Sequence, residues 1–365
     1  MKKALKIAGI VLLSAVALLL IFCLITSVVH GVKTKNEIKL LKDAGYYNPV
    51  SVGDYCLNVA KFGNPDGKHR IVGLAGLGMG DFALAARQMT ASLEADNLVV
   101  FVDRAGYGFS DDTHEDMTLS HIVEDYRKAL KEAEVEAPYL LMAHSIGGAY
   151  ANYWVSQYPD EIEGVVFVDG SQLSEDAFVD EEPYEVCFGD RVLVFLAKLG
   201  FSRYVLREYH YHYPDNYTEE EQALGDALIF MTLDSVAPLS EDANLAENAQ
   251  DAFSYIVTNG VPKLYICASW GIASEEDIIE VNGWINRQIE INKLDIPMRP
   301  LSYDRESVES ILANYEKARR EVIYPYAEKM GNCQVVLLAG DHMIYEQKPE
   351  ACGSLIKEFI DGLEG

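Results

Sequence analysis

The chain has 365 residues, and 57 acidic against 30 basic side chains give it a formal net charge of −27 at neutral pH. Such an acidic surface repels the phosphates of nucleic acids and of anionic lipids, so we expect no nucleic-acid partner. The six cysteines form no C-x-x-C pair, which argues against cysteine-based metal or redox sites and leaves disulfide pairing open.

The first 30 residues are predicted to be a transmembrane anchor. Three lysines precede an uncharged apolar run from Ile7 to Val29, which exceeds the roughly 20 residues that a membrane helix needs. A cleaved signal peptide is the alternative, but its apolar core is about 7–15 residues long and ends at a small-residue cleavage site, which this run lacks. The basic amino terminus favours a cytoplasmic start, with the catalytic part of the chain on the extracytoplasmic side of the membrane.

Residues 31–47 are predicted to be a linker that ends in a short helix, and the core is predicted to begin at residue 48. Apolar runs bounded by turn signals predict the strands of the core. Several of these runs are apolar throughout, as expected for parallel strands buried on both faces. The predicted strands cover residues 50–52, 55–62, 70–75, 98–102, 139–143, 164–168, 263–268 and 335–339, and the main predicted helices cover 82–93, 119–130 and 349–363.

A glycine-rich turn, Ala75-Gly76-Leu77-Gly78-Met79-Gly80, follows the strand at 70–75. A phosphate-binding loop is one interpretation of such a turn. However, the turn has neither the lysine of a P-loop nor the glycine spacing of a dinucleotide fingerprint.

Ser145 interrupts an apolar strand, and a helix-forming segment follows it directly. The residues two positions before and after it are Ala143 and Gly147, which are small enough for the strand and the helix to pass closely. The usual pattern is G-x-S-x-G, so Ala143 is a mild steric departure. Ser145 is therefore a candidate nucleophile.

Two further side chains complete a possible catalytic set. His342 follows the last predicted strand, and a histidine with an ordinary pKa of about 6.5 can take a proton from a serine hydroxyl at neutral pH. Asp169 ends the strand at 164–168, and we favour it as the acid over Glu276 and Asp277, which stand farther beyond their strand in a helical segment.

Residues 172–261 interrupt the alternation of strands and helices with an irregular, helical and aromatic-rich segment. Within it, residues 191–199 could face lipid, although burial against the core is favoured. His210 and His212 alternate as metal ligands can, but no third ligand is nearby, so we expect no metal site.

The chain order serine, acid, histidine and the turn at Ser145 resemble the α/β-hydrolase superfamily, in its capped, esterase- and lipase-like branch. The resemblance runs from about Asn48 to Leu363 and implies a mostly parallel central sheet flanked by helices. A helical cap would be inserted after strand 6, at residues 172–261, between core parts 48–171 and 262–365. It also implies that the backbone N–H groups of Leu77 and Ile146 form the oxyanion hole. The segment Asp103-Arg104-Ala105-Gly106-Tyr107-Gly108-Phe109-Ser110 resembles the family's D-R-x-G-x-G-x-S loop, whose role is mostly structural.

This resemblance implies a serine hydrolase with Ser145, His342 and Asp169 as its triad and with no cofactor or metal. Its substrate would be a small ester-type molecule, and the aromatic residues of the cap favour an apolar one. An acyltransferase or a peptidase on the same fold is one alternative, because fold and triad do not determine the acceptor. A catalytically silent binding module is another.

Overall fold

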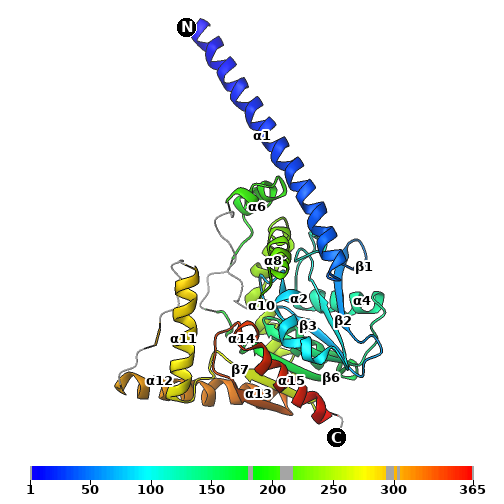
Figure 1. Cartoon of the computed structure of the whole chain (residues 1–365), viewed down its shortest axis with the longest axis vertical. Helices are drawn as coiled ribbons and strands as arrows, with labels where there is room; N and C mark the ends of the chain where they lie inside the picture. Colours follow the sequence, from blue (N-terminus) through cyan, green and yellow to red (C-terminus); the bar gives the residue numbers. More distant parts are fainter. Residues whose placement is uncertain (1, 180–183, 206–216, 293–299, 302–304, 364–365) are drawn as a thin grey trace.

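The computed structural model describes residues 2–179, 184–205, 217–292, 300–301 and 305–363. Within them, eight strands form one sheet with helices on both of its faces (Figure 1). The strands are β1 (Pro49–Ser51), β2 (Cys56–Gly63), β3 (Arg70–Leu74), β4 (Leu98–Val102), β5 (Tyr139–Ser145), β6 (Ile162–Gly170), β7 (Lys263–Cys267) and β8 (Cys333–Leu337).

The helices that precede or lie between the strands of the first half are α1 (Lys2–Asp43), α2 (Phe82–Ala85), α3 (Arg87–Thr90), η1 (Ala91–Leu93), α4 (Leu119–Glu132), α5 (Gly147–Gln157) and η2 (Pro159–Glu161). Those between β6 and β7 are α6 (Phe188–Lys198), α7 (Ser202–Val205), α8 (Glu219–Thr232), α9 (Ala237–Ala243) and α10 (Leu245–Ser254). The remaining helices are α11 (Glu275–Asn292), α12 (Arg305–Ala318), η4 (Arg319–Ile323), α13 (Tyr324–Met330), α14 (Ile344–Gln347) and α15 (Pro349–Leu363).

The sheet has the strand order β1-β2-β4-β3-β5-β6-β7-β8. Strand β2 pairs antiparallel with β1 and β4, and every other neighbouring pair is parallel. The mostly parallel sheet and the helical insertion after β6 are thus confirmed, whereas the domain boundaries remain predictions. The chain leaves β3 towards β4 on one side and leaves β5 towards β6 on the other. This reversal of strand order makes the carboxyl edge between β3 and β5 the expected place for a ligand.

Both faces of the central strands are buried. In β5, Leu141 and Ala143 pack into one hydrophobic cluster, whereas Leu140 and Met142 pack into a second cluster on the other face. Helices α4, α5, α10 and α13 contribute to the first cluster, and α2, α8, α14 and α15 contribute to the second. Because neighbouring residues of a strand point to opposite faces, a run without polar residues is what this two-sided burial requires.

Helix α1 is longer than the sequence predicts. It runs without a break from Lys2 to Asp43, so most of the linker expected at residues 31–47 is helical. Tertiary contacts explain the difference, because Leu41 is fully buried in the core and Glu37 forms an ion pair with Arg203. Among the described residues, one helix, at Lys6–Asp43, is long and apolar enough to cross a membrane.

The prediction that residues 191–199 are buried against the core is wrong, because most of helix α6 is exposed. Only Val194 and Ala197 of this helix are buried, and most of its large apolar side chains are exposed. The physical reason is its position: α6 lies beside α1 at the outer surface of the molecule and away from the sheet (Figure 1).

All six cysteines are free thiols, so none of the disulfides that the sequence left open is formed. Burial raises the pKa of Cys267, Cys333 and Cys352 to about 12 in each case. Because the thiolate is the reactive form, these three thiols are expected to be inert at neutral pH.

Candidate active site

Ser145 ends β5 and has a left-handed backbone with a φ of 53°. Such a conformation is costly for a residue other than glycine and is often found where function requires it. Two residues later, a side chain on Gly147 would clash with the carbonyl oxygen of Leu74, so the start of α5 can pass β3 only with glycine there. The strand, sharp turn and helix that the sequence predicts around Ser145 are present.

The glycine-rich turn after β3 lies against Ser145. A Cβ atom on Gly76 would lie 3.0 Å from the Cβ atom of Ser145 and 2.9 Å from Nδ1 of His144. Leu77 is the next residue of this turn, and Ile146 directly follows the serine. The two residues expected to supply oxyanion-hole N–H groups therefore lie on the two segments that meet at Ser145, and that role remains a prediction.

Arg104 is hydrogen-bonded to the backbone of the glycine-rich turn. Its guanidinium donates hydrogen bonds of 2.8 Å to the carbonyl oxygens of both Ala75 and Gly76. The same side chain donates to Oε2 of Glu241 in α9, at 2.9 Å. Arg104 is buried, so a positioning role agrees with the structural role that the resemblance implies for its loop.

Asp169 lies at the end of β6, next to β5, and also has a left-handed φ, of 49°. Its buried carboxylate accepts hydrogen bonds from the backbone N–H groups of Ala268 and Ser269, at 2.8 and 2.9 Å, and from the Ser269 hydroxyl at 2.5 Å. Burial alone would raise the pKa of Asp169, but hydrogen bonds from His342 and Ser269 outweigh burial and lower it. The carboxylate is therefore ionised at neutral pH.

His342 lies in the loop after β8, and its Nδ1 atom is 2.8 Å from Oδ2 of Asp169. Because an ionised carboxylate only accepts hydrogen bonds, Nδ1 carries the proton. Nε2 is then free of a proton and can act as a base. The side chain of His342 is 45% exposed, so a substrate can approach the imidazole.

The two alternative acids lie elsewhere, and Asp277 has partners of its own. Asp277 accepts hydrogen bonds from the N–H groups of Ala273 and Ser274, at 2.8 and 2.9 Å, while its own N–H donates to the Ser274 hydroxyl. This reciprocal pattern is a capping box at the start of α11. Glu276 is exposed beside it. The structure thus brings Asp169 to His342 and uses Asp277 to cap a helix.

Two residues of the site were missed in the sequence. Ser269 follows β7, the neighbour of β6 in the sheet, and this position could have indicated a residue in contact with Asp169. His144 precedes the serine, and its Nε2 donates to the carbonyl oxygen of His342 at 3.0 Å. Burial and the nearby His342 lower the pKa of His144 to about 3, so it stays neutral and links β5 to the loop of His342.

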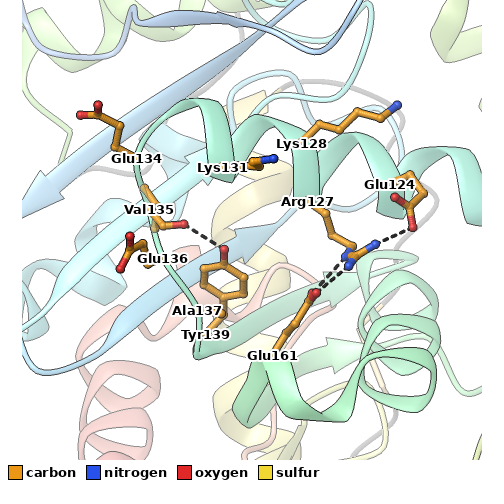
Figure 2. Close-up of a pocket in the computed structure, with 10 residues that line it drawn as sticks. All are labelled: Glu124, Arg127, Lys128, Lys131, Glu134, Val135, Glu136, Ala137, Tyr139 and Glu161. Carbon is orange, nitrogen blue, oxygen red and sulfur yellow. Dashed lines mark hydrogen bonds and ion pairs between the residues drawn. The ribbon is translucent and has the colours of Figure 1, made fainter.

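A cavity of about 650 Å³ lies away from this site, along α4 and the loop before β5 (Figure 2). Its lining is largely charged, with Arg127 donating hydrogen bonds to Glu124 and Glu161. Tyr139 lines it at the first residue of β5, whereas Ser145 ends that strand. The cavity therefore opens at the opposite edge of the sheet and takes no part in the chemistry at Ser145. His210 and His212, considered above as metal ligands, lie outside the described residues.

Comparisons with known proteins agree with this geometry. A family described as alpha/beta hydrolase fold matches residues 75–189, which include the glycine-rich turn, Ser145 and Asp169. The crystal structure of haloalkane dehalogenase DbeA from Bradyrhizobium elkani is similar with a TM-score of 0.53, at 16% identity over 87% of this chain and 98% of that one. At this identity the likeness shows the fold alone.

Two curated proteins are similar in sequence. "Uncharacterized protein YbdG" of Bacillus subtilis is 32% identical over 56% of this chain and 62% of its own length. "Putative methylesterase 14, chloroplastic" of Arabidopsis thaliana is 29% identical over 33% of this chain and 32% of its own length. The chain thus matches less than two thirds of the length of these relatives.

Proposed function

We propose that this chain, whose residues 75–189 match the alpha/beta hydrolase fold family, is a serine hydrolase that cleaves a carboxylic ester through an acyl-enzyme intermediate. Ser145 is the proposed nucleophile, His342 the base and Asp169 the orienting acid. The observation that carries this proposal is the hydrogen bond between Nδ1 of His342 and Asp169, made where β6 ends beside the left-handed Ser145.

In the proposed reaction, Nε2 of His342 takes the proton of the Ser145 hydroxyl while Oγ attacks the ester carbonyl carbon. The carbonyl oxygen becomes an oxyanion and accepts hydrogen bonds from the N–H groups of Leu77 and Ile146. His342 then protonates the departing alcohol, which leaves Ser145 acylated. Water, deprotonated by the same imidazole, releases the acid and restores the serine. This chemistry needs no metal or cofactor.

Asp169 supports the reaction in a specific way. Its ionised carboxylate fixes the tautomer of His342 with the proton on Nδ1 and stabilises the imidazolium that forms during the attack. The three hydrogen bonds from Ala268 and Ser269 hold this carboxylate in place. A buried carboxylate with so many donors cannot turn away from the histidine without losing them.

We propose an apolar ester as the substrate class. The inserted helices between β6 and β7 lie over the carboxyl edge of the sheet: Thr232 of α8 accepts a hydrogen bond from the N–H of Gly108, and α8 contributes to the same hydrophobic cluster as α2. The methylesterase name of a relative, which covers a third of this chain, is in keeping with a small carboxylic ester.

We also propose that α1 is a retained membrane anchor. Thr26 and His30, near the end of its apolar run, are buried against the rest of the chain, and His30 lies 2.9 Å from Asp234. Cleavage of the segment as a signal would remove these contacts. The protein should therefore stay with membranes through a carbonate wash and keep its first residues, whereas a mature amino terminus beyond Val29 would contradict the anchor.

The experiment for the hydrolase proposal uses purified full-length protein in detergent with a fluorophosphonate probe and nitrophenyl esters of increasing acyl length. We expect covalent labelling at Ser145 and turnover of the esters, with the dependence on chain length giving the size of the pocket. A protein that neither labels nor hydrolyses any ester would instead be a silent binding module. Labelling together with amide cleavage that is faster than ester cleavage would favour a peptidase.

A further inference from the structure

Helix α6 carries an exposed apolar surface. Phe188, Leu193 and Phe195 are 82%, 65% and 60% exposed. Phe188, Val192 and Phe195 are four and three positions apart, so they lie on one face of the helix. Apolar side chains gathered on one exposed helix face mark a surface for a protein partner or for a membrane.

The carboxyl end of α6 packs directly on α1. Gly200 follows this end with a φ of 82°, and a Cβ atom there would lie 2.6 Å from Cβ of His30 and 3.0 Å from the carbonyl oxygen of Thr26. No side chain larger than glycine fits between the two helices. Helix α6 therefore meets α1 at the last turns of its apolar run, and Figure 1 shows it beside α1 where the free half of that helix leaves the body.

Residues just after α6 reach farther along the apolar run. The rings of Phe201 and Tyr204 lie 5.6 and 6.4 Å from the ring of Phe22, measured between centroids. Phe22 lies seven residues before Val29, which corresponds to about 10 Å along a helix that rises 1.5 Å per residue. If α1 spans a bilayer, these two aromatic residues lie at the depth to which interfacial helices enter, about 5–10 Å.

Polar contacts hold this arrangement. Arg203 of α7 donates two hydrogen bonds to the carboxylate of Glu37, at 2.7 and 2.6 Å, and one to Nδ1 of His30 at 2.8 Å. Because Nδ1 of His30 accepts, Nε2 carries the proton and donates to Asp234 at 2.9 Å. Helix α7, which follows α6 closely, and Asp234, just after α8, are thus both held against α1.

We propose that α6 lies in the interface of the same membrane that α1 spans, with Phe188, Val192 and Phe195 among the acyl chains. This inference rests on the anchor proposed above and not on the hydrolase chemistry. The lipid bilayer is favoured over a protein partner because the surface adjoins a helix of membrane-spanning length and composition. Apolar burial would drive the contact, since the acidic chain is repelled by anionic headgroups.

The test uses the full-length protein in phosphatidylcholine vesicles whose acyl chains carry bromine, which quenches tryptophan on contact. One added tryptophan is compared in three variants: Phe195→Trp in α6, Leu18→Trp at the middle of the apolar run, and Val257→Trp as the control. Val257 is also an exposed apolar residue, but it precedes β7 and lies near the amino edge of the sheet. The emission of the wild type, with its three tryptophans, is subtracted.

We expect Phe195→Trp to lose emission most strongly with bromine near the headgroups, Leu18→Trp with bromine near the chain ends, and Val257→Trp with neither. Quenching of Leu18→Trp without quenching of Phe195→Trp would refute the inference and leave the anchor intact. If the protein self-associates in the vesicles and this shields the tryptophan at position 195 from bromine, the inference is also refuted, because a second copy then covers α6. If neither Phe195→Trp nor Leu18→Trp is quenched, both the inference and the anchor are wrong. Ester hydrolysis is not part of any of these readouts.

Discussion

Arg104 and Glu241 form a buried ion pair, with Nε of the arginine 2.9 Å from Oε2 of the glutamate, that joins the core to α9. The same glutamate accepts a hydrogen bond from the hydroxyl of Tyr150 in α5 at 2.5 Å. Arg104 also donates hydrogen bonds to the carbonyl oxygens of Ala75 and Gly76, so this one side chain links the inserted helix α9 to the glycine-rich turn.

Removal of one partner of this ion pair should lower the stability of the fold. Glu241→Ala leaves the guanidinium of Arg104 buried without its carboxylate, and breaking a buried pair in this way lowers the free energy of unfolding by about 3–5 kcal/mol. Urea unfolding in detergent measures the change. The control is Glu309→Ala, because Glu309 pairs with Arg305 at an exposed position of α12 and should show no measurable effect. Equal effects of the two substitutions on the free energy of unfolding would contradict a stabilising role of the buried pair between Arg104 and Glu241.

The acid of the triad can be identified by comparing three substitutions. Asp169→Asn should reduce ester turnover by about 10⁴, because the amide favours the wrong tautomer of His342. Asp277→Asn should cost about 0.3–1 kcal/mol of stability, because the negative charge at the start of α11 is lost, with turnover unchanged. Glu276→Gln should change neither. Collapse of turnover in either of the later two, with Asp169→Asn active, would place the acid beyond β7.

Ser269 is expected to lower the pKa of the Asp169 carboxyl group. Ser269→Ala removes the hydroxyl hydrogen bond to Oδ2 of Asp169, so the pKa of this carboxyl should rise. A more basic carboxylate holds the imidazolium of His342 more tightly, and the acid limb of the kcat/KM profile should move to higher pH. The matched control is Ser274→Ala, which touches only the cap of α11. A purely structural role for Ser269 would lower the rate without moving the limb.

Much of this architecture could be predicted from the sequence because it is local. Buried strands are apolar runs, so all eight were found to within a few residues, and α15 was predicted with its observed ends. Asp169 was favoured as the acid because it ends a predicted strand, but its contact with His342, 173 residues away, could be seen only in the fold. Long-range contacts also explain the two wrong structural predictions. The linker expected at residues 31–47 is helical as far as residue 43 because Leu41 is buried in the core and Arg203 contacts the helix. Helix α6 was expected to be buried but is exposed, because it packs on α1 and not on the sheet.

Glu346 in α14 should make stability depend on pH. Its Oε1 atom is buried without a hydrogen-bond partner among the described residues, and burial, with help from Asp81 and Asp341, raises the pKa of Glu346 to about 8. Between the ordinary value near 4.5 and 8, the folded state keeps a proton that the unfolded state loses. Stability should therefore fall with rising pH, by at most about 1.4 kcal/mol per pH unit.

Glu346→Gln removes this titration, so the variant should gain stability relative to the wild type as pH rises through that window. Urea unfolding of both proteins at several pH values measures the difference. Glu350→Gln, at the exposed start of α15, is the control and should follow the wild type. A difference between Glu346→Gln and the wild type that is constant from pH 5 to 8 would show that Glu346 is ionised in the folded protein.

The most direct test of the central claim is the ester turnover of Ser145→Ala, measured in full-length protein whose folding is verified by circular dichroism. The account predicts a loss on the order of 10⁶ in turnover, as expected when a triad serine is removed, together with loss of fluorophosphonate labelling. Retention of more than about a tenth of the wild-type rate, which corresponds to less than about 1.4 kcal/mol of transition-state stabilisation, would show that Ser145 is not the nucleophile.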